Sequence, residues 1–413
     1  MKEAHGCDFD IVIAGGGMVG TCLALALAPL GLRVAVVEAV ERGIPGQPSF
    51  DDRSTALSRS SRRMFEAMRL WEQIEGASTP IASIHVSERG RFGFAHIDAH
   101  QQKVDALGYV VINRVLGDVL QSAMTQVSGL EFLCPARITA VNLETSGATV
   151  TVDRAGQSTN ITCSLLVAAD GANSTVRSML GIGARQRGYG QHAVIGNVLP
   201  EVSPANRAFE RFTQAGALAL LPVAGDRAAF VWCLPDADAA ELMLLPDSEF
   251  IQRLQETFGL RLGQLDRVGR RACYPLTLSQ AEQLTARRSA LVGNAAHGLH
   301  PVAAQGFNLG MRDVAALCDC IADAMRTGGA ASIGSEEVLA AYREWRYDDQ
   351  RKVVQFTDGL VRLFGTDLAS VRTARNIAML GFDLLPGVRT LFARHTMGLA
   401  GRLPRLARGV PLE

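Results

Sequence analysis

Two periods of apolar residues run along the chain and separate the expected strands from the expected helices. Short runs rich in β-branched residues, or alternating apolar and polar residues, predict β-strands. These strand-like segments are 8–14, 32–38, 165–169, 217–222 and 228–234. Apolar residues at helical spacing predict helices at 21–29, 305–318 and 336–351. The order predicts an α/β protein with a separate β-sheet region and a C-terminal helical segment.

The length and charge of the chain limit the classes of function. Its 413 residues exceed the size at which one hydrophobic core keeps growing, which favours two or three sub-domains. Lys and Arg together number 41, equal to Asp and Glu, so the chain has no basic field that would recruit nucleic acid. The eight cysteines form no CxxC pair and no zinc spacing, which predicts no metal site and favours a reduced, cytoplasmic setting.

Membrane contact is expected only at the surface of the protein. Residues 1–10 do not have the pattern of a signal peptide, and the longest apolar stretch, 21–37, is interrupted by proline, glycine and arginine. Residues 375–408 carry six arginines and one acid, with apolar residues between them at loosely helical spacing. This pattern fits a segment peripheral to the inner membrane or a partner-docking helix, and equally a C-terminal helix packed on its own protein.

The first strand, helix and strand carry a glycine motif typical of dinucleotide binding. Gly15, Gly17 and Gly20 stand where they permit a tight turn, a close approach of pyrophosphate to the backbone, and close helix packing. The helix N-terminus then presents its partial positive charge to the phosphates. Glu38 ends the second strand, 18 positions after Gly20, and suits a ribose 2′-hydroxyl. The alternative is a tight turn without a ligand, and the motif alone does not separate FAD from NAD.

Three later stretches, far apart in the sequence, point to FAD. They are 50–58, which contains Arg53; 165–177, which contains Asp170-Gly171; and 291–313, which contains Gly293-Asn294 and Gln305-Gly306. With the glycine motif, they resemble the FAD-dependent aromatic hydroxylases of the 4-hydroxybenzoate hydroxylase type, from residue 10 to about residue 315. Asn294 replaces the usual Asp, and His-Pro-x-x-x-Gln-Gly-Phe-Asn-Leu-Gly-x-Arg-Asp follows it. Both features are similar to the ubiquinone-biosynthesis branch of this family.

The resemblance implies a set of residues that contact FAD. Asp170-Gly171 follows the second nucleotide-binding strand of the family, Gly293-Asn294 matches the contact to the ribityl chain, and Arg114 matches a position near the phosphates. The helix that begins at Gln305 matches one whose N-terminus stabilises the reduced flavin ring. The expected contacts are Gly15, Gly17, Gly20, Glu38, Arg53, Arg114, Asp170, Gly171, Gly293, Asn294, Gln305, Gly306 and Asn308.

Some of these residues have a simpler alternative. Arg53 and Arg114 also suit surface ion pairs, and Asp170 also suits the cap of the turn that follows it. The resemblance implies that the backbone carbonyl of Pro301 lies beside the substrate ring. His300 and Tyr274 are the candidate bases for the phenol, although a packed or capping histidine is the stronger interpretation of His300.

The implied activity is ring hydroxylation of a polyprenylated phenol in ubiquinone biosynthesis, with FAD as cofactor and NAD(P)H and O2 as co-substrates. The expected substrate is 2-polyprenyl-6-methoxyphenol, hydroxylated through a flavin C4a-hydroperoxide. Alternatives are a flavin-dependent prenyl-lipid reductase, a hydroxylase of another aromatic ring in the same family, and a flavoprotein retained as an assembly factor. Further candidate partners are a membrane surface, a ubiquinone-biosynthesis complex and a second copy of the chain; nucleic acid is not expected.

The expected organisation combines a discontinuous FAD-binding domain, a substrate domain and a helical tail. The Rossmann-like FAD-binding domain takes residues 1–75, 100–180 and 275–335, the substrate-binding β-sheet domain 76–99 and 181–274, and the C-terminal helical region 336–413. Within the substrate domain, Glu210 and Arg211 are expected on a solvated strand face.

Two further segments lie close to the expected active site. Residues 356–364 and 379–385 are rich in large apolar side chains and are candidate walls of a groove for the prenyl chain. Ala303 and Ala304 occupy a segment where family members usually keep a glycine. If one of them needs a left-handed backbone, alanine there costs on the order of 1 kcal/mol.

Overall fold

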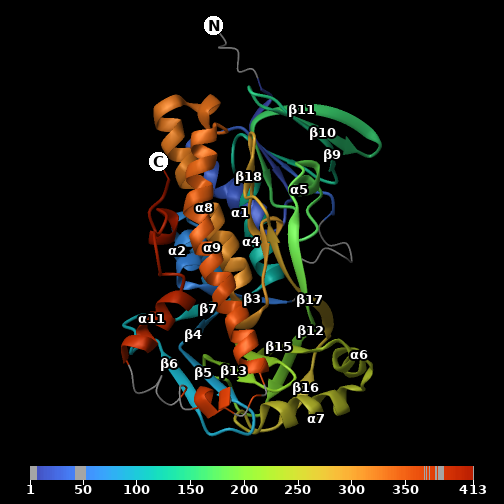
Figure 1. Cartoon of the computed structure of the whole chain (residues 1–413), viewed down its shortest axis with the longest axis vertical. Coiled ribbons are helices and arrows are strands. Elements are labelled where there is room, and N and C mark those ends of the chain that lie inside the picture. The colour runs from blue at the N-terminus through green and yellow to red at the C-terminus, as the bar shows by residue number, and fades with distance from the viewer. Residues whose placement is uncertain are drawn as a thin grey trace.

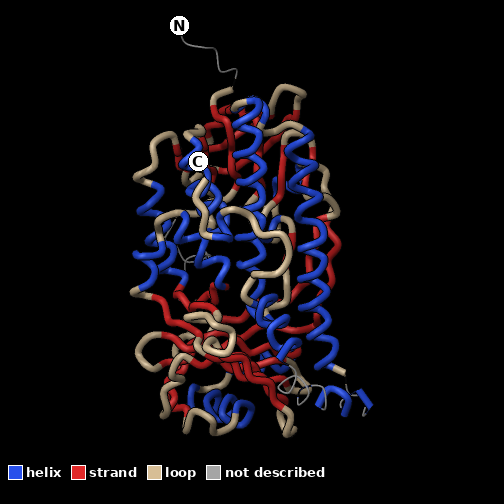
Figure 2. Tube along the Cα trace, turned by 90° about the vertical axis from the view of Figure 1, so that its left-hand side faces the viewer, coloured by secondary structure: helices blue, strands red, loops and turns tan. Residues whose placement is uncertain are grey.

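The computed structural model describes residues 7–41, 53–366, 368, 370–371, 373–376, 379 and 386–412. The molecule has two halves stacked along its long axis (Figure 1). Helices gather in the upper half, and the strands of the lower half cross beneath them (Figure 2). The predicted α/β fold, with a β-sheet region and a C-terminal helical segment, is confirmed.

An eight-stranded sheet fills the upper half. Its strand β1 (Phe9–Ala14) pairs in parallel with β2 (Val34–Val37) on one side and with β11 (Gln157–Ala168) on the other. Parallel sheets are covered on both faces, and the neighbouring side chains Ile11 and Val12, which point to opposite faces, are accordingly both fully buried. The path runs β18 (Thr285–Ala286), β19 (Ser289–Leu291), β11, β1, β2, β8 (Leu130–Leu133), and β10 (Ala148–Arg154) and β9 (Arg137–Leu143) extend β11.

Helices pack on this sheet and on one another. Helix α1 (Met18–Leu27) contacts α4 (Asn113–Met124) and α8 (Gln305–Gly328), and it is buried from Gly20 to its end. The long helix α9 (Glu336–Gly365) packs along α8 and continues beside the lower half (Figure 1). The shorter helical segments are α2 (Arg59–Ala67), α3 (Trp71–Glu75), α5 (Thr175–Met179), η1 (Ala28–Leu30), η3 (Gly293–Ala295), η4 (Val302–Ala304) and η5 (Ala330–Ser332).

A nine-stranded sheet forms most of the lower half. Its path runs β20 (His297–Gly298), β17 (Ala272–Ala281), β12 (Ala184–Pro200), β15 (Arg227–Pro235), β14 (Ala217–Val223), β13 (Arg207–Phe212), β5 (Ser83–Glu88) and β6 (Phe94–Asp98), with β16 (Leu265–Val268) beside β12. One face packs against α6 (Asp236–Leu244) and α7 (Asp247–Phe258), where Phe230 and Phe250 are fully buried. The opposite face is also apolar, and it borders the cavity described below.

A three-stranded sheet and the end of the chain join the two halves. Strand β7 (Gly108–Ile112) pairs with β3 (Ser54–Ser58) and β4 (Ser78–Ile81). Helix α11 (Pro386–Thr396) lies beside β6 in Figure 1. The final turn η6 (Leu406–Arg408) packs on α2 and adds Leu406 to the main core.

The predicted strands and helices are present, but the sheets do not follow the predicted domain division everywhere. Strand β4 falls in the range 76–99 and pairs with β7, whereas β20 falls in the range 275–335 and joins the nine-stranded sheet. The three-region division therefore stays a prediction. Residues 380–385 of one predicted wall, and residues 50–52 beside Arg53, lie outside the described residues.

Candidate active site

The glycine-rich turn between β1 and α1 has space for glycine only. Gly15 has a φ of +102°, and a Cβ atom there would lie 2.6 Å from the carbonyl oxygen of Ala169. A Cβ at Gly20 would lie 2.0 Å from the carbonyl oxygen of Gly15. Gly17 begins α1 in an extended conformation, and no side chain of the described residues caps the helix there. The first N–H groups of a helix have no partner within it, so this turn presents donors to a ligand.

The carboxylate of Glu38 lies against this turn. Its Oε2 accepts a hydrogen bond from the backbone N–H of Gly16 at 2.6 Å, and its Oε1 accepts one from Val40 at 2.8 Å. Each carboxylate oxygen can accept a further bond. Glu38 is thus held at the end of β2, beside the glycine-rich turn, and its two carboxylate oxygens can both accept a hydrogen bond from a ribose hydroxyl.

Asp170 and Gly171 follow β11. Gly171 has a φ of +87° and open space around it. The Asp170 side chain accepts hydrogen bonds from the Ser174 hydroxyl and, at 3.1 Å, from the backbone N–H of Val176. Asp170 therefore stabilises the start of α5, which is the simpler alternative considered above. Its contact with FAD stays a prediction.

Two predicted FAD contacts, Arg53 and Arg114, and a third arginine, Arg177, have different surroundings. Arg53 lies over the ring of Tyr274, 4.7 Å from its centroid. Arg114 is exposed in the first turn of α4. Arg177 is buried, and its guanidinium donates to the carbonyl oxygen of Ala295 at 2.9 Å, which ties the Asp170 turn to η3. Sequence reasoning gave Arg177 no role because its partner lies more than a hundred residues away.

The expected ribityl contact lies beside the glycine-rich turn. Gly293 has a φ of +58°, and a Cβ there would lie 3.1 Å from the side chain of Val19 in α1. Gly310 of α8 packs against the same Val19 side chain. Asn294 is exposed, so its amide is accessible to a ligand. The starts of α1 and α8 and the Gly293-Asn294 turn therefore converge, as the cofactor prediction requires.

A buried carboxylate that the sequence reasoning missed holds this arrangement. Asp313 is fully buried in α8 and accepts hydrogen bonds from the backbone N–H of Gly293 at 3.0 Å and from His297 at 2.6 Å. It also accepts from Arg346 at 2.7 Å and from Gln350 at 2.9 Å, both in α9. Burial raises the pKa of Asp313, but His297 and Arg346 outweigh it and hold the pKa below its ordinary value.

His300 is packed behind the loop that leads to α8. Its Nδ1 accepts from the backbone N–H of Val302 at 3.3 Å, its Nε2 lies 3.3 Å from the side-chain oxygen of Gln191, and Tyr189 packs edge-on against its ring. Burial lowers the pKa of His300 to about 4, so the ring is neutral at pH 7. These contacts favour the packed alternative, while its catalytic role stays a prediction. Pro301, in contrast, lines the cavity.

The loop turns into α8 through two left-handed alanines. Ala303 has a φ of +60° and Ala304 a φ of +51°. The expected strain therefore falls on both positions rather than one. Gln305 is buried and donates to the carbonyl oxygen of Ala303 at 2.9 Å, whereas a Cβ at Gly306 would meet nothing within 4 Å. The helix thus begins beside open space, where a flat ring can approach its N–H groups.

Asn308 is bound on all sides by the protein. Its Oδ1 accepts from the backbone N–H of Ser58 and the hydroxyl of Ser61, and its Nδ2 donates to the carbonyl oxygens of Ala56 and Ala304. These four bonds use the two acceptor and two donor positions of the amide. Asn308 therefore fixes β3 against the start of α8, and its direct contact with FAD stays a prediction.

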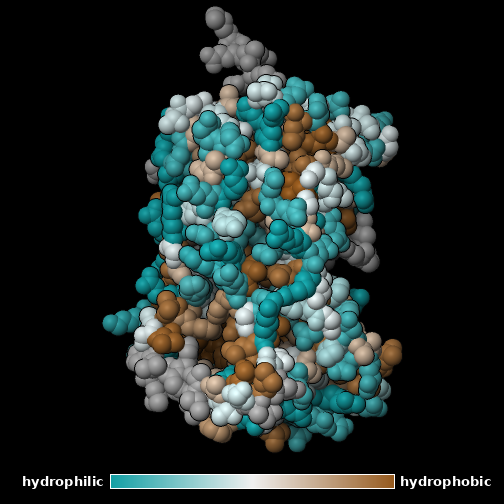
Figure 3. Space-filling model, in the orientation of Figure 1, coloured by the Kyte–Doolittle hydropathy of each residue, from teal (hydrophilic) through white to brown (hydrophobic). Residues whose placement is uncertain are grey.

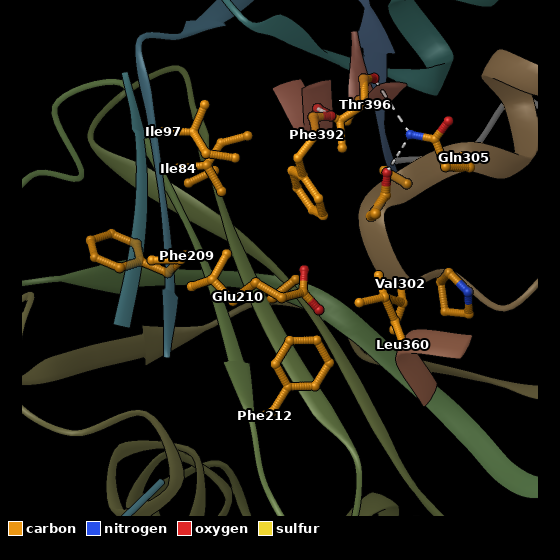
Figure 4. Close-up of a pocket in the computed structure, with 18 of the residues that line it drawn as sticks. Ile84, Ile97, Phe209, Glu210, Phe212, Val302, Gln305, Leu360, Phe392 and Thr396 are labelled. Atoms are coloured by element: carbon orange, nitrogen blue, oxygen red, sulfur yellow. Dashed lines mark hydrogen bonds between the residues drawn. The ribbon is translucent and has the colours of Figure 1, made fainter. Parts of the chain in front are cut away.

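A cavity of about 570 Å³ lies between the nine-stranded sheet and the loop of residues 301–305. Most of its lining is apolar, and it includes residues of α9 and α11 (Figure 4). Figure 3 shows a hollow in the lower half with apolar residues around it. The lining side chains shown in Figure 4 include Ile84, Ile97, Phe209, Glu210, Phe212, Val302, Gln305, Leu360, Phe392 and Thr396.

The prediction that Glu210 lies on a solvated face of β13 is wrong. Its carboxylate points into the cavity toward Val302 (Figure 4), because Ala208 and Phe212, two residues away on either side, line the same cavity. Arg211 lies on the opposite face of the sheet. Both predicted walls contribute to the lining, 356–364 through Leu360, Leu363 and Phe364 and 379–385 through Met379, its one described residue. Tyr274 is not part of the lining.

The comparison with known families decides what this arrangement belongs to. Residues 8–357 match the family model described as FAD binding domain. The chain belongs to this flavoprotein family. It is 38% identical to the ubiquinone hydroxylase UbiL of Rhodospirillum rubrum, over 98% of this chain and 93% of that protein. It is 31% identical to the 3-demethoxyubiquinol 3-hydroxylase of Escherichia coli K12, over 94% of this chain and 98% of that protein.

The fold is also that of solved flavin monooxygenases. The p-nitrophenol 4-monooxygenase PnpA from Pseudomonas putida DLL-E4 superimposes with a TM-score of 0.78 at 18% identity, covering 95% of this chain and 98% of that one. The predicted FAD cofactor, monooxygenase class and ubiquinone-biosynthesis branch are confirmed, and NAD(P)H is the typical electron donor of the family. Among the described residues, no helix combines the length and apolarity that crossing a membrane requires.

Proposed function

We propose that the protein hydroxylates the ring of a polyprenylated phenol in ubiquinone biosynthesis, using NAD(P)H and O2, with 2-polyprenyl-6-methoxyphenol as substrate. The observation that carries the proposal is an apolar cavity of about 570 Å³ that ends at the Pro301 loop, next to the start of α8. The names of the related ubiquinone hydroxylases support the same substrate class.

The residues present fit FAD. The glycine-rich turn is a cradle that a Cβ at Gly15 or Gly20 would fill, and the open N-terminus of α1 suits the pyrophosphate. Glu38 suits the ribose, and the exposed amide of Asn294 suits the ribityl hydroxyls. When bound, FAD reduced by NAD(P)H supplies the activation of oxygen. The protein contributes the binding, the orientation and the exclusion of water from the cavity.

The cavity suits an aromatic ring with a prenyl chain. Its volume lies within the range of about 300–1,000 Å³ that is usual for small-molecule pockets. Phe212 and Phe364 stack with their centroids 3.6 Å apart at one wall, and Phe392 of α11 lines it from another side. A ring and the first isoprene units fit such a space, so a longer chain has to continue toward the outside.

Helix α11 is the part of the tail that suits a membrane surface. Phe392 and Thr396 line the cavity, whereas Val388 and Leu391 are 49% and 63% exposed on the outer side. The end of the tail packs on its own protein instead, since Arg405 pairs with Asp323. Contact of α11 with a bilayer would bring the cavity near a substrate that is dissolved there.

The decisive experiment compares three measurements on the purified FAD-loaded protein with a short-chain 2-prenyl-6-methoxyphenol. Substrate-dependent NAD(P)H oxidation, equal consumption of O2 and a ring-hydroxylated product support the proposal. Product formed without O2 consumption identifies a prenyl-lipid reductase. In a deletion strain, accumulation of the 6-methoxyphenol precursor supports the assigned step, whereas accumulation of another intermediate moves the enzyme to another ring position, and normal ubiquinone refutes the role.

The assembly-factor alternative needs its own test. A variant in which Gly20 is replaced by Val blocks the cradle, since even a Cβ there lies 2.0 Å from the Gly15 oxygen. If that variant, made at normal levels without FAD, restores ubiquinone in the deletion strain, the enzymatic proposal is wrong.

A further inference from the structure

Glu210 is a carboxylate placed in an otherwise apolar wall. Strand β13 pairs with β5 and β14, and the residues opposite Glu210 are Val86 and Ala219. Both line the cavity, as does Val231, which stands next along the same row on β15. The alternation of the strand therefore aims one acid at the centre of an apolar surface.

The side chain of Glu210 forms no hydrogen bond or ion pair with any of the described residues. The other polar side chains of the lining form hydrogen bonds or ion pairs with groups other than Glu210. Arg375 pairs with Glu88, 3.0 Å between Nε and Oε2, and it stacks over Phe364. Gln305 donates to backbone carbonyl oxygens, and the Thr396 hydroxyl donates to its own helix.

Of the described residues, the Glu88–Arg375 pair and the buried thiol of Cys233 face the same side of the sheet, and burial and then Glu210 raise the pKa of that thiol. Tyr274 and the exposed Arg227 face this side as well, but neither lines the cavity. His85 and Arg211 lie on the opposite face, since His85 is opposite Phe209, whose ring packs against Phe258. Among the described residues, no cation therefore pairs with the carboxylate of Glu210.

Such a group costs stability, which points to a use in binding. A carboxylate without a partner in an apolar lining is unfavourable when ionised. Burial raises the pKa of Glu210 to about 7, so it changes its charge in the range where a general base is most effective. A hydroxyl group in the cavity would supply the missing hydrogen-bond donor.

We propose that Glu210 binds the ring hydroxyl of the phenol and accepts its proton during hydroxylation. This inference rests on the proposed function. The phenol O–H bond breaks, its electron pair stays on the oxygen, and the proton moves to a carboxylate oxygen of Glu210. The ring becomes richer in electrons and takes up one oxygen atom from O2, while the two electrons of NAD(P)H reduce the other atom to water. The ring then releases its C–H proton to the water that forms from the second oxygen atom, and Glu210 returns its proton to the product oxygen.

The test replaces Glu210 by Gln, which keeps the shape, and by Leu, which removes the acceptor. With Glu210→Gln, the rate of hydroxylation of 2-farnesyl-6-methoxyphenol at pH 8 should fall about 100-fold, as expected for loss of a general base. The wild-type rate should fall tenfold per unit below pH about 7, and this acidic limb should be absent from the variant. The fraction of oxidised NAD(P)H that yields product should fall as well.

A binding measurement separates a contact with substrate from a structural role. Wild-type protein should bind the farnesyl phenol at least about 10-fold more tightly than its O-methyl ether, because the ether cannot donate a hydrogen bond to the charged carboxylate. Glu210→Leu should bind the two equally. Glu249→Gln, on the surface of α7, is the matched control and should leave the preference for the phenol over its ether unchanged.

Stability supplies a measurement independent of activity. The raised pKa of Glu210 destabilises the folded state increasingly from pH about 4.3 to pH about 7 and fully above it. Glu210→Leu should therefore melt above wild type at pH 8 and by a smaller margin at pH 5. Wild-type protein that forms no hydroxylated product defeats the proposed function. An active wild type whose Glu210→Gln variant keeps the rate and the acidic limb defeats the role of Glu210 alone.

Discussion

Replacing Asp313 by Asn is expected to remove several kilocalories of stability and the FAD with it. The carboxylate accepts four hydrogen bonds, which join the Gly293 turn and His297 to α9 through Arg346 and Gln350. Asn has one acceptor oxygen, and its amide nitrogen would face groups that donate. Two of the four bonds are therefore lost, and Arg346 loses one of its two carboxylate partners.

The size of the stability loss follows from the burial of the Asp313–Arg346 ion pair. Arg346 is 2% exposed and Asp313 is 0% exposed. Removing one member of a buried ion pair costs about 3–5 kcal/mol, because the remaining charge has no solvent to stabilise it. Against a total stability of about 5–15 kcal/mol, such a loss is large. The Gly293 turn would lose its anchor, so the purified variant should also contain less FAD.

Urea unfolding of the FAD-loaded protein, followed by circular dichroism and flavin fluorescence, measures this loss. Asp348→Asn is the matched control, since Asp348 lies on α9, is 65% exposed and should change stability by less than about 0.5 kcal/mol. A loss below about 1 kcal/mol for Asp313→Asn, within the range of a single neutral hydrogen bond, would refute the reasoning.

The pH dependence of the same difference has a definite sign. The folded pKa of Asp313 is held below its unfolded value, which is about 3.9. Its stabilisation is therefore complete above pH about 4 and is lost as the pH falls through the folded pKa. The difference between wild type and Asp313→Asn should be constant from pH 8 to pH 5 and should shrink in stronger acid. A difference that grows with falling pH contradicts the assignment.

Three further substitutions test other parts of the structure. Ala304→Gly removes the strain of an alanine with a φ of +51°, which costs about 1 kcal/mol, although the greater freedom of glycine in the unfolded chain offsets part of this gain. The melting temperature and the FAD content should therefore stay equal or rise, and a clear loss of either contradicts this. Gly20→Ala places a Cβ 2.0 Å from the Gly15 oxygen and should yield protein with little FAD; normal FAD content would refute the cradle. Leu391→Ser on α11 should reduce sedimentation with anionic vesicles, whereas Leu260→Ser, 72% exposed in the segment after α7, should not; equal effects would exclude α11 as the contact.

The FAD half of the site could be predicted because its signals are local. Gly15, Gly17 and Gly20 are fixed by the geometry of one turn, and Glu38 ends the adjacent strand. Helices α8 and α9 carry their period over many residues, so their existence was clear and only their ends were not.

The substrate half depends on contacts between distant segments. An antiparallel strand with one apolar and one polar face usually leaves the polar face in water, so Glu210 was expected to be solvated. In this fold, that face is covered by the loop of residues 301–305 and by α9 and α11. The four bonds of Asp313 likewise join residues that are 16 to 37 positions apart, which no local pattern reveals. The apolar residues two positions before and after it, Ala208 and Phe212, were the available signal for Glu210.

The loop of residues 301–305 connects the two halves of the site, and this gives the substitutions distinct consequences. Its left-handed alanines turn the chain from the cavity wall at Pro301 to the start of α8 beside the predicted flavin position. A change in this loop therefore alters the cofactor side and the substrate side together. Glu210 reaches the cavity from the opposite wall and contacts none of the predicted FAD residues through a hydrogen bond among the described residues. A Glu210 variant should thus lose hydroxylation while it keeps FAD, whereas a variant of this loop should change both.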